Sequence, residues 1–281
     1  MKDTLFILLQ HLLPQHLLSR AAGFLADSRI GWIKSTFIKL FAKHYQVNMA
    51  EALIEDLDRY GNFNEFFTRE LKPGMRPIAE ADIVSPADGA VSQIGSIDYG
   101  RIFQAKGRGY GLTTLLGGHT ELADPFINGR FATIYLSPKD YHRVHMPVTG
   151  TLRETIYIPG DLYSVNQTTA EGVDNLFARN ERLVAIFDTE FGPMAMVLVG
   201  AMIVAGIETV WAGQVAPQQN KSWRINHQTP PQPVILEKGA EMGRFKLGST
   251  VVLLFGKDAT EWSDQLQAET PVQLGQAISQ S

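Results

Sequence analysis

Short β-rich runs, separated by Gly and Pro at short intervals, fill the chain from about Asn62 onward. The clearest runs are residues 131–136, 144–158, 183–188, 194–201, 203–210 and 250–255. Runs of this length bounded by turn residues are typical of strands, and 25 Gly with 14 Pro in 281 residues provide many turns. The pattern predicts a folded-over sheet or barrel-like core.

The first 60 residues predict helices instead. An apolar i, i+3, i+4 pattern runs over residues 5–13 until Pro14 stops it. Residues 29–45 carry a broad apolar stripe flanked by cations, and residues 49–60 predict a third helix with Asn48 as its N-cap. The expected fold is therefore α+β, with N-terminal helices on a β-rich, barrel-sandwich-like core.

The net charge of −4 is distributed unevenly along the chain. Residues 1–48 hold six Lys and Arg against two Asp, a local balance of +4, so the remainder carries −8. A basic, apolar arm on an acidic body favours an anionic membrane surface over nucleic acid as the partner. A plainer interpretation stays open: the stripe of residues 29–45 packs on the body while its lysines face solvent.

The longest apolar run, residues 191–207, falls short of a typical membrane-spanning helix and contains Pro193 and three Gly. We interpret it as two buried strands. Residues 213–235 are polar and proline-rich, so an exposed loop is expected there. The chain has no Cys, which excludes disulfides, thiol nucleophiles and Cys-based metal sites.

The bond between Gly248 and Ser249 is suited to self-cleavage, because a serine hydroxyl attacks a preceding glycine carbonyl with least hindrance. Attack would turn the amide into an ester, and β-elimination would release the upstream chain. The remaining dehydroalanine would lose ammonia to become a pyruvoyl cap. The residues alone favour a turn before a core strand, with Ser249 capping backbone groups. A serine hydrolase fits less well, because no Gly-x-Ser-x-Gly elbow surrounds Ser249.

Six segments, in this order, resemble the bacterial phosphatidylserine decarboxylases over almost the whole chain. They are YGNFNEFFTREL at 60–71, SPADG at 85–89, YHRVHMP at 141–147, FARNER at 177–182, IETVWAG at 207–213 and KGAEMGRF at 238–245. The resemblance implies a proenzyme that cuts itself after Gly248 into a β chain, residues 1–248, and an α chain, residues 249–281. The α chain would begin with the pyruvoyl group made from Ser249.

The same resemblance assigns Asp88, His145 and Ser249 to a self-cleavage triad, and His142 to a supporting role in decarboxylation. Neutral imidazole, with an ordinary pKa of about 6.5, can take the hydroxyl proton near neutral pH. Asp88 could fix the imidazole tautomer and stabilise the imidazolium. Plainer alternatives are an Asx-turn role for Asp88 and a structural role for His142.

Ser137 followed by Pro138 predicts a one-turn helix ending near His142. Two His and one Asp could also bind a metal ion, but catalytic zinc usually shows a tighter ligand motif, so no metal is expected.

The implied reaction is decarboxylation of phosphatidylserine. Its amine would form a Schiff base with the pyruvoyl ketone, CO2 would leave, and phosphatidylethanolamine would be released. Residues 1–60 would dock the catalytic domain, residues 61–281, on the cytoplasmic side of the cell membrane as a peripheral protein. The family also suggests a dimer of αβ units. The alternatives are a non-cleaving peripheral lipid-binding protein of the same fold and a pyruvoyl decarboxylase for a soluble amino acid, against which the basic, apolar arm argues.

Overall fold

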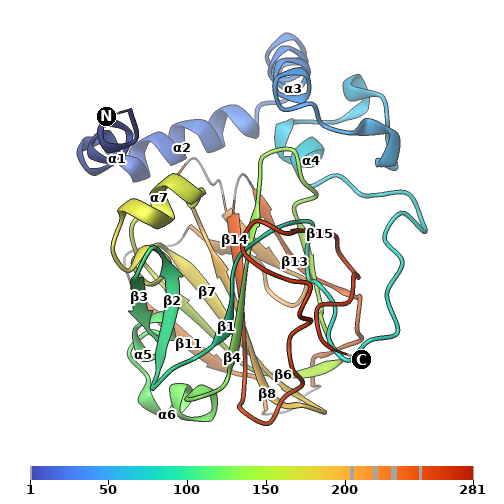
Figure 1. Ribbon diagram of the computed structural model, residues 1–281. Helices are drawn as coiled ribbons and strands as arrows, with labels where there is room; N and C mark the ends of the chain where they lie inside the picture. Colours follow the sequence, from blue (N-terminus) through green and yellow to red (C-terminus); the bar gives the residue numbers. More distant parts are fainter. Residues whose placement is uncertain (1, 203–205, 218–220, 229–232, 247–248, 281) are drawn as a thin grey trace.

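The computed structural model describes residues 2–202, 206–217, 221–228, 233–246 and 249–280. Its longer helices gather in the N-terminal part and its strands fill the rest, which confirms the predicted α+β class (Figure 1). Among the described residues, we find no helix with the length and apolar character needed to cross a membrane.

Three helices open the chain: α1 (Lys2–Leu12), α2 (Gln15–Ala26) and α3 (Gly31–Tyr45). Figure 1 shows them along one side of the molecule, beyond the ends of the main strands. Two glutamine side chains fasten α1 and α2 to the body: the backbone N–H of Ser164 donates to Gln10 and that of Leu162 donates to Gln15, each at 2.7 Å. The predicted helices over 5–13 and 29–45 are confirmed.

The helix α3 packs on the short helix α4 (Phe63–Phe67) through aromatic rings. Phe37 stacks on Phe63 with ring centroids 4.2 Å apart, and Phe41 meets the edges of neighbouring rings. A separate buried cluster of residues between Ala26 and Phe67 results. It crosses the expected domain boundary at residues 60–61, and the division into a docking region and a catalytic domain stays a prediction.

The predicted helix over residues 49–60 is wrong. The structure has two 3-10 turns there, η1 (Met49–Glu51) and η2 (Leu57–Arg59). The backbone at the end of η1 and just after it pairs with residues 70–72. The N–H of Leu53 donates to the carbonyl of Glu70, and the N–H of Lys72 donates to the carbonyl of Glu51. These long-range bonds use groups that a helix would need, so the segment stays extended. Asn48 does act as a cap, accepting from the N–H of Ala50.

The main sheet has nine strands in the order β11-β6-β7-β8-β14-β4-β1-β15, with β12 also paired to β6. Within the described residues, its neighbouring strands all pair antiparallel. Its strands are β1 (Gly89–Ser96), β4 (Arg130–Leu136), β6 (Gly150–Ile158), β7 (Arg182–Thr189), β8 (Gly192–Val199), β11 (Trp223–Asn226), β12 (Ile235–Leu236), β14 (Ser249–Phe255) and β15 (Pro271–Val272).

A smaller sheet has the order β10-β9-β13-β5, and β2 pairs with β3 in a hairpin. These strands are β2 (Arg101–Ala105), β3 (Arg108–Gly111), β5 (Arg143–His145), β9 (Gly206–Thr209), β10 (Gly213–Ala216) and β13 (Glu241–Lys246). The remaining short helices are α5 (Leu112–Leu115), α6 (Thr120–Ala123), η3 (Asp124–Phe126), α7 (Gln167–Gly172) and α8 (Leu176–Arg179).

Both faces of the main sheet are buried, which explains its nearly continuous apolar runs. On β8, Ala195 and Val197 belong to a cluster shared with the β2–β3 hairpin and the short helices. Met196 and Leu198 point the other way, into a cluster shared with the smaller sheet and the C-terminal segment. Alternate side chains of one strand thus serve two cores.

The predicted strands correspond to β4, β5 with β6, β7, β8, β9 and β14. The run 191–207 forms parts of two strands, as expected, although residues 203–205 lie outside the described residues. The exposed loop expected over 213–235 is wrong in part, because β10, β11 and β12 lie within it and pair with β9 and β6. Trp223 on β11 stacks against Tyr157 of β6, which gives this polar stretch a packing partner.

Candidate active site

Ser249 is the first residue of β14, the strand held between β4 and β8. It pairs with Leu136 of β4, and its side chain is completely buried. Among the described residues, its hydroxyl has no hydrogen-bond partner, so Ser249 caps none of their backbone groups as the plainer interpretation expected. A buried, unbonded hydroxyl is unusual because its desolvation is uncompensated. Gly248, the other half of the expected cleavage site, lies outside the described residues.

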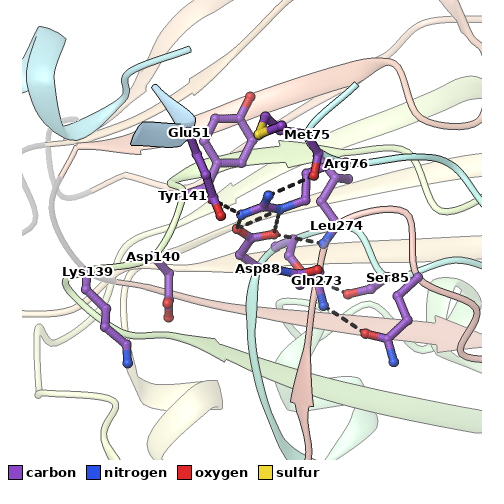
Figure 2. A network of polar contacts seen from close by, with 12 residues as sticks. Glu51, Met75, Arg76, Ser85, Asp88, Lys139, Asp140, Tyr141, Gln273 and Leu274 are labelled. Carbon is purple, nitrogen blue, oxygen red and sulfur yellow. Dashed lines mark hydrogen bonds and ion pairs between the residues drawn. The ribbon is translucent and has the colours of Figure 1, made fainter. Parts of the chain in front are cut away.

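Asp88 precedes β1 and is held by charge-assisted hydrogen bonds (Figure 2). The Arg76 guanidinium donates to both carboxylate oxygens, from Nε at 2.8 Å and 3.1 Å and from Nη2 at 2.6 Å. The backbone N–H of Leu274 adds a bond at 2.9 Å. Arg76 also pairs with Glu51 at 2.7 Å. This network fixes the carboxylate through groups that are distant in sequence.

His145, on β5, is bound on both ring nitrogens. The carbonyl of Gly239 accepts from Nδ1 at 2.8 Å, which assigns the proton to Nδ1. The Nε2 atom is then free to accept from the Tyr141 hydroxyl at 3.1 Å. Burial lowers the pKa of His145, so the neutral imidazole is the favoured form. The basic lone pair of the ring is therefore on Nε2, where the Tyr141 hydroxyl occupies it.

The structure gives His145 a different orienting partner from the expected one. Among the described residues, no hydrogen bond joins the Asp88 carboxylate to His145, and Gly239 fixes the tautomer instead. The two segments still touch through the backbone, where the N–H of His145 donates to Pro86 at 2.8 Å. The direct Asp–His contact of a Ser-His-Asp triad is thus absent from the described arrangement.

The register of the main sheet places the Asp88 loop and Ser249 at the same end of its strands. Tyr135 of β4 pairs with Ala90 of β1 on one side and with Thr250 of β14 on the other. The backbones of β1 and β14 are therefore two strand spacings, about 10 Å, apart at this end of the sheet. The approach of β1 to β4 needs Gly89, since a Cβ there would lie 2.2 Å from the Tyr135 carbonyl oxygen.

His142 lies just before β5 and is completely buried. Its ring packs on Phe67 with centroids 3.9 Å apart, and the carbonyl of Asp140 lies 2.9 Å from Nδ1, which assigns the proton there. The Nε2 atom has no partner. Burial, with a smaller contribution from the nearby Arg69 cation, lowers the pKa of His142 to about 3. His142 is therefore neutral, with a buried lone pair on Nε2.

The one-turn helix predicted before His142 is wrong. Residues 137–140 form a turn in which the Asp140 carboxylate accepts from both the N–H and the hydroxyl of Ser137 at 2.7 Å. Because one carboxylate closes this turn, the backbone need not continue as a helix. The turn leads into β5, so His145 lies on this strand and His142 lies directly before it.

A pocket of about 530 Å³ lies beside these residues. Its lining includes Asp88, Gly89 and Ala90, and residues of the chain from Tyr135 to Tyr141. The charged residues Arg69, Arg76 and Glu51 line it as well. Within the described part of the chain, no group of three or more His, Cys, Asp or Glu is arranged to hold a metal ion.

Arg69, Arg76 and Tyr141 have no role predicted from the sequence, although Arg69 and Tyr141 lie in segments that resemble the family. Arg69 directly follows the apolar run at Phe66 and Phe67, and a cation beside residues expected to be buried is the signal that could have identified it.

A family model described as phosphatidylserine decarboxylase matches residues 63–280, and a second, described as PSD, matches residues 5–46. The chain belongs to the phosphatidylserine decarboxylase family. Three relatives are each named phosphatidylserine decarboxylase proenzyme. Those of Pseudomonas fluorescens and Azotobacter vinelandii are 60% and 62% identical, each over 100% of this chain and 99% of the relative. That of Pseudomonas putida is 61% identical over 99% and 98%.

Proposed function

We propose that this protein decarboxylates phosphatidylserine to phosphatidylethanolamine after cutting itself between Gly248 and Ser249. Membership of the phosphatidylserine decarboxylase family and the name proenzyme on its relatives support this proposal. The observation that carries it is the Ser249 hydroxyl, fully buried and unbonded at the start of a central strand.

Self-cleavage begins with the Ser249 hydroxyl as nucleophile and a neutral histidine as base. The Nε2 lone pair of His145 takes the hydroxyl proton while Oγ attacks the Gly248 carbonyl carbon. The amide nitrogen leaves, gains a proton and becomes the amine of an ester-linked Ser249. Removal of the Cα proton then expels the Gly248 carboxylate, and hydrolysis of the dehydroalanine releases ammonia. The Asp88 carboxylate, held by Arg76, supports the positive charge that His145 gains.

The surroundings of Ser249 fit a pyruvoyl group. The residue is enclosed, and the strand behind it, Thr250–Phe255, is hydrogen-bonded to β4 and β8 on both sides. A group at this position is therefore shielded from solvent and held by backbone that cleavage leaves unchanged. Once formed, the pyruvoyl ketone supplies the electron-withdrawing centre that decarboxylation needs.

His142 acts in the decarboxylation step, by orienting the substrate through Nε2. Its pKa of about 3 makes the imidazolium a minor form near neutral pH, so accepting a hydrogen bond suits it better than donating a proton. Tyr141 and the Asp88 loop line the pocket from which the headgroup would approach.

The helices α1, α2 and α3 dock the protein on the membrane as a peripheral protein of the cytoplasmic side. Several of their apolar side chains are strongly exposed, including Leu12 at 74%, Phe24 at 81% and Trp32 at 75%. Together with the local charge of +4 in residues 1–48, these groups suit an anionic lipid interface. A dimer of αβ units is proposed from the family resemblance alone.

The test is release of CO2 from phosphatidylserine in anionic vesicles by the purified wild-type protein, beside Ser249→Ala. We expect turnover to phosphatidylethanolamine by the wild type and none by the variant. A wild-type protein that binds the vesicles but releases no CO2 would instead support the non-cleaving lipid-binding alternative.

A further inference from the structure

Arg69 is a buried cation with unused hydrogen-bond donors. Its side chain belongs to a residue only 4% exposed. The Nη2 atom donates to the backbone carbonyls of Lys139 at 3.0 Å and Asp140 at 3.5 Å. The Nε and Nη1 atoms have no hydrogen-bond partner, and no ion pair joins Arg69 to any carboxylate among the described residues. Burying an unpaired charge is unfavourable, so an anionic partner would stabilise this arrangement.

Arg182 shows how the same fold satisfies a buried arginine that has no ligand. Arg182 is 2% exposed, and its donors reach the carbonyls of Leu115, Asn180 and Thr114 at 2.7–2.9 Å. Backbone carbonyls are thus sufficient to hold a guanidinium in this interior. The free N–H donors of Arg69 are therefore not a general property of buried arginines in this protein but depend on where Arg69 lies.

That location is the wall of the ≈ 530 Å³ pocket. Among the other charges there, Arg76 is neutralised by Asp88 and Glu51, and the Asp140 carboxylate is occupied by Ser137. Lys139 also lines the pocket and forms no ion pair with a described carboxylate. The cations and carboxylates of this wall balance in number, but the Arg69 guanidinium stays without an ion pair among the described residues.

We propose that Arg69, assisted by Lys139, binds the phosphodiester of the lipid headgroup in this pocket. The proposal rests on the proposed function for the identity of the lipid. The free Nε and Nη1 atoms lie on different edges of the guanidinium, and each can donate one charge-assisted hydrogen bond to a phosphodiester oxygen. Lys139 adds a second, less directional positive charge from the turn that Arg69 itself contacts.

The reaction favours the phosphodiester over the substrate carboxylate as the anion. An ion pair with the carboxylate would be lost as CO2 forms, so it would stabilise the substrate more than the transition state. The phosphodiester keeps its charge in the substrate, the transition state and the product. Binding it affects all three alike, so the loss of Arg69 should raise KM and leave kcat nearly unchanged.

The experiment uses matured enzyme carrying Arg69→Met, Arg69→Lys or Lys139→Met. Arg153→Met is the matched control, since Arg153 pairs with Asp188 outside the pocket. Binding of dihexanoyl phosphatidylethanolamine, the product headgroup, is measured by calorimetry. We expect Kd to rise about 10- to 100-fold for Arg69→Met. Smaller increases are expected for Arg69→Lys and Lys139→Met, and none for Arg153→Met.

Steady-state kinetics with dihexanoyl phosphatidylserine separate the remaining outcomes. A matching rise in KM with little change in kcat supports the proposal. A higher KM with unchanged product binding would assign Arg69 to the carboxylate and overturn it, as would a fall in kcat alone or no change in either. If Arg69→Met fails to mature, Arg69→Lys and Lys139→Met decide by the same criteria. A wild type that binds the product lipid but releases no CO2 would contradict the proposed function and leave the phosphodiester site standing.

Discussion

Besides the Arg69 donors, the buried atoms near the pocket that lack a hydrogen-bond partner in the described part of the chain include Ser249 Oγ and His142 Nε2. Most buried polar atoms in native proteins are paired, so atoms of this kind mark places where a further group acts. His145 differs, because both of its ring nitrogens are bonded and its tautomer is set. At the residue scale, His145 is thus prepared to accept a proton before any substrate arrives, whereas His142 has a lone pair still unused.

The pH dependence of self-cleavage tests the role of His145. Burial lowers its pKa below the ordinary 6.5, so the neutral base persists as the pH falls through that value. We expect the cleavage rate of freshly translated chain to stay level near pH 6.5 and to fall only in more acidic buffer. His145→Gln should cleave about 10²- to 10⁴-fold more slowly at every pH. A decline of the wild-type rate centred above pH 6.5 would contradict this role.

Substitution of His142 should separate maturation from decarboxylation. We expect His142→Asn to mature like the wild type, because its amide can still donate to the Asp140 carbonyl. Lacking Nε2, it should release CO2 about 100-fold more slowly or worse. Chain cleavage is followed by mass and turnover by CO2 release. An equal loss of both activities would point to a structural histidine or to a role in self-cleavage.

The family resemblance predicted roles for Asp88, His142, His145 and Ser249, but not the groups that contact them. Gly239, which fixes the His145 tautomer, lies 94 residues away along the chain, and Leu274, which binds Asp88, lies 186 residues away. Backbone groups of this kind carry no side-chain signal. Their positions depend on the register of the sheets, which local pattern does not determine.

At the element scale, the strands were predicted well where apolar runs are long, as in β4, β7, β8 and β14. The helix expected over 49–60 was wrong because backbone bonds to residues 70–72 replaced local ones. Likewise, β11 lies in a polar stretch and pairs with β6, a strand far earlier in the chain. Local pattern predicts an element when its own residues supply the burial, and fails when a remote segment supplies the hydrogen bonds.

The exposed apolar side chains of α2 and α3 should control membrane binding. We expect Phe24→Ser and Trp32→Ser each to weaken binding to phosphatidylserine-containing vesicles by roughly tenfold, as expected for the loss of a buried aromatic contact. Tyr99→Ser is the control, because Tyr99 is 93% exposed but lies outside the N-terminal helices. Vesicle sedimentation provides the measurement. Equal binding by all three variants and the wild type would mean that these helices do not dock the protein.

At the scale of the whole molecule, the segment after the proposed cut is threaded through the fold. Its first strand, β14, lies between β4 and β8, and β15 pairs with β1 at the edge of the same sheet. Leu274 donates to Asp88, so the C-terminal segment also helps to form the site. Cleavage would therefore leave the architecture intact.

The two chains should consequently stay together after maturation. We expect residues 1–248 and 249–281 to co-elute in gel filtration under native conditions and to separate only in denaturant. The reason is that β14 is bonded on both sides and contributes to both buried clusters. Elution of the small chain by itself in native buffer would contradict this arrangement.

The most direct measurement of the central claim is the intact mass of the wild-type protein under denaturing conditions, beside Ser249→Ala. The account predicts two fragments from the wild type, with the smaller one blocked at its start by a pyruvoyl group, and a single uncut chain of about 31 kDa from the variant. One uncut mass from both proteins would contradict self-cleavage at Ser249.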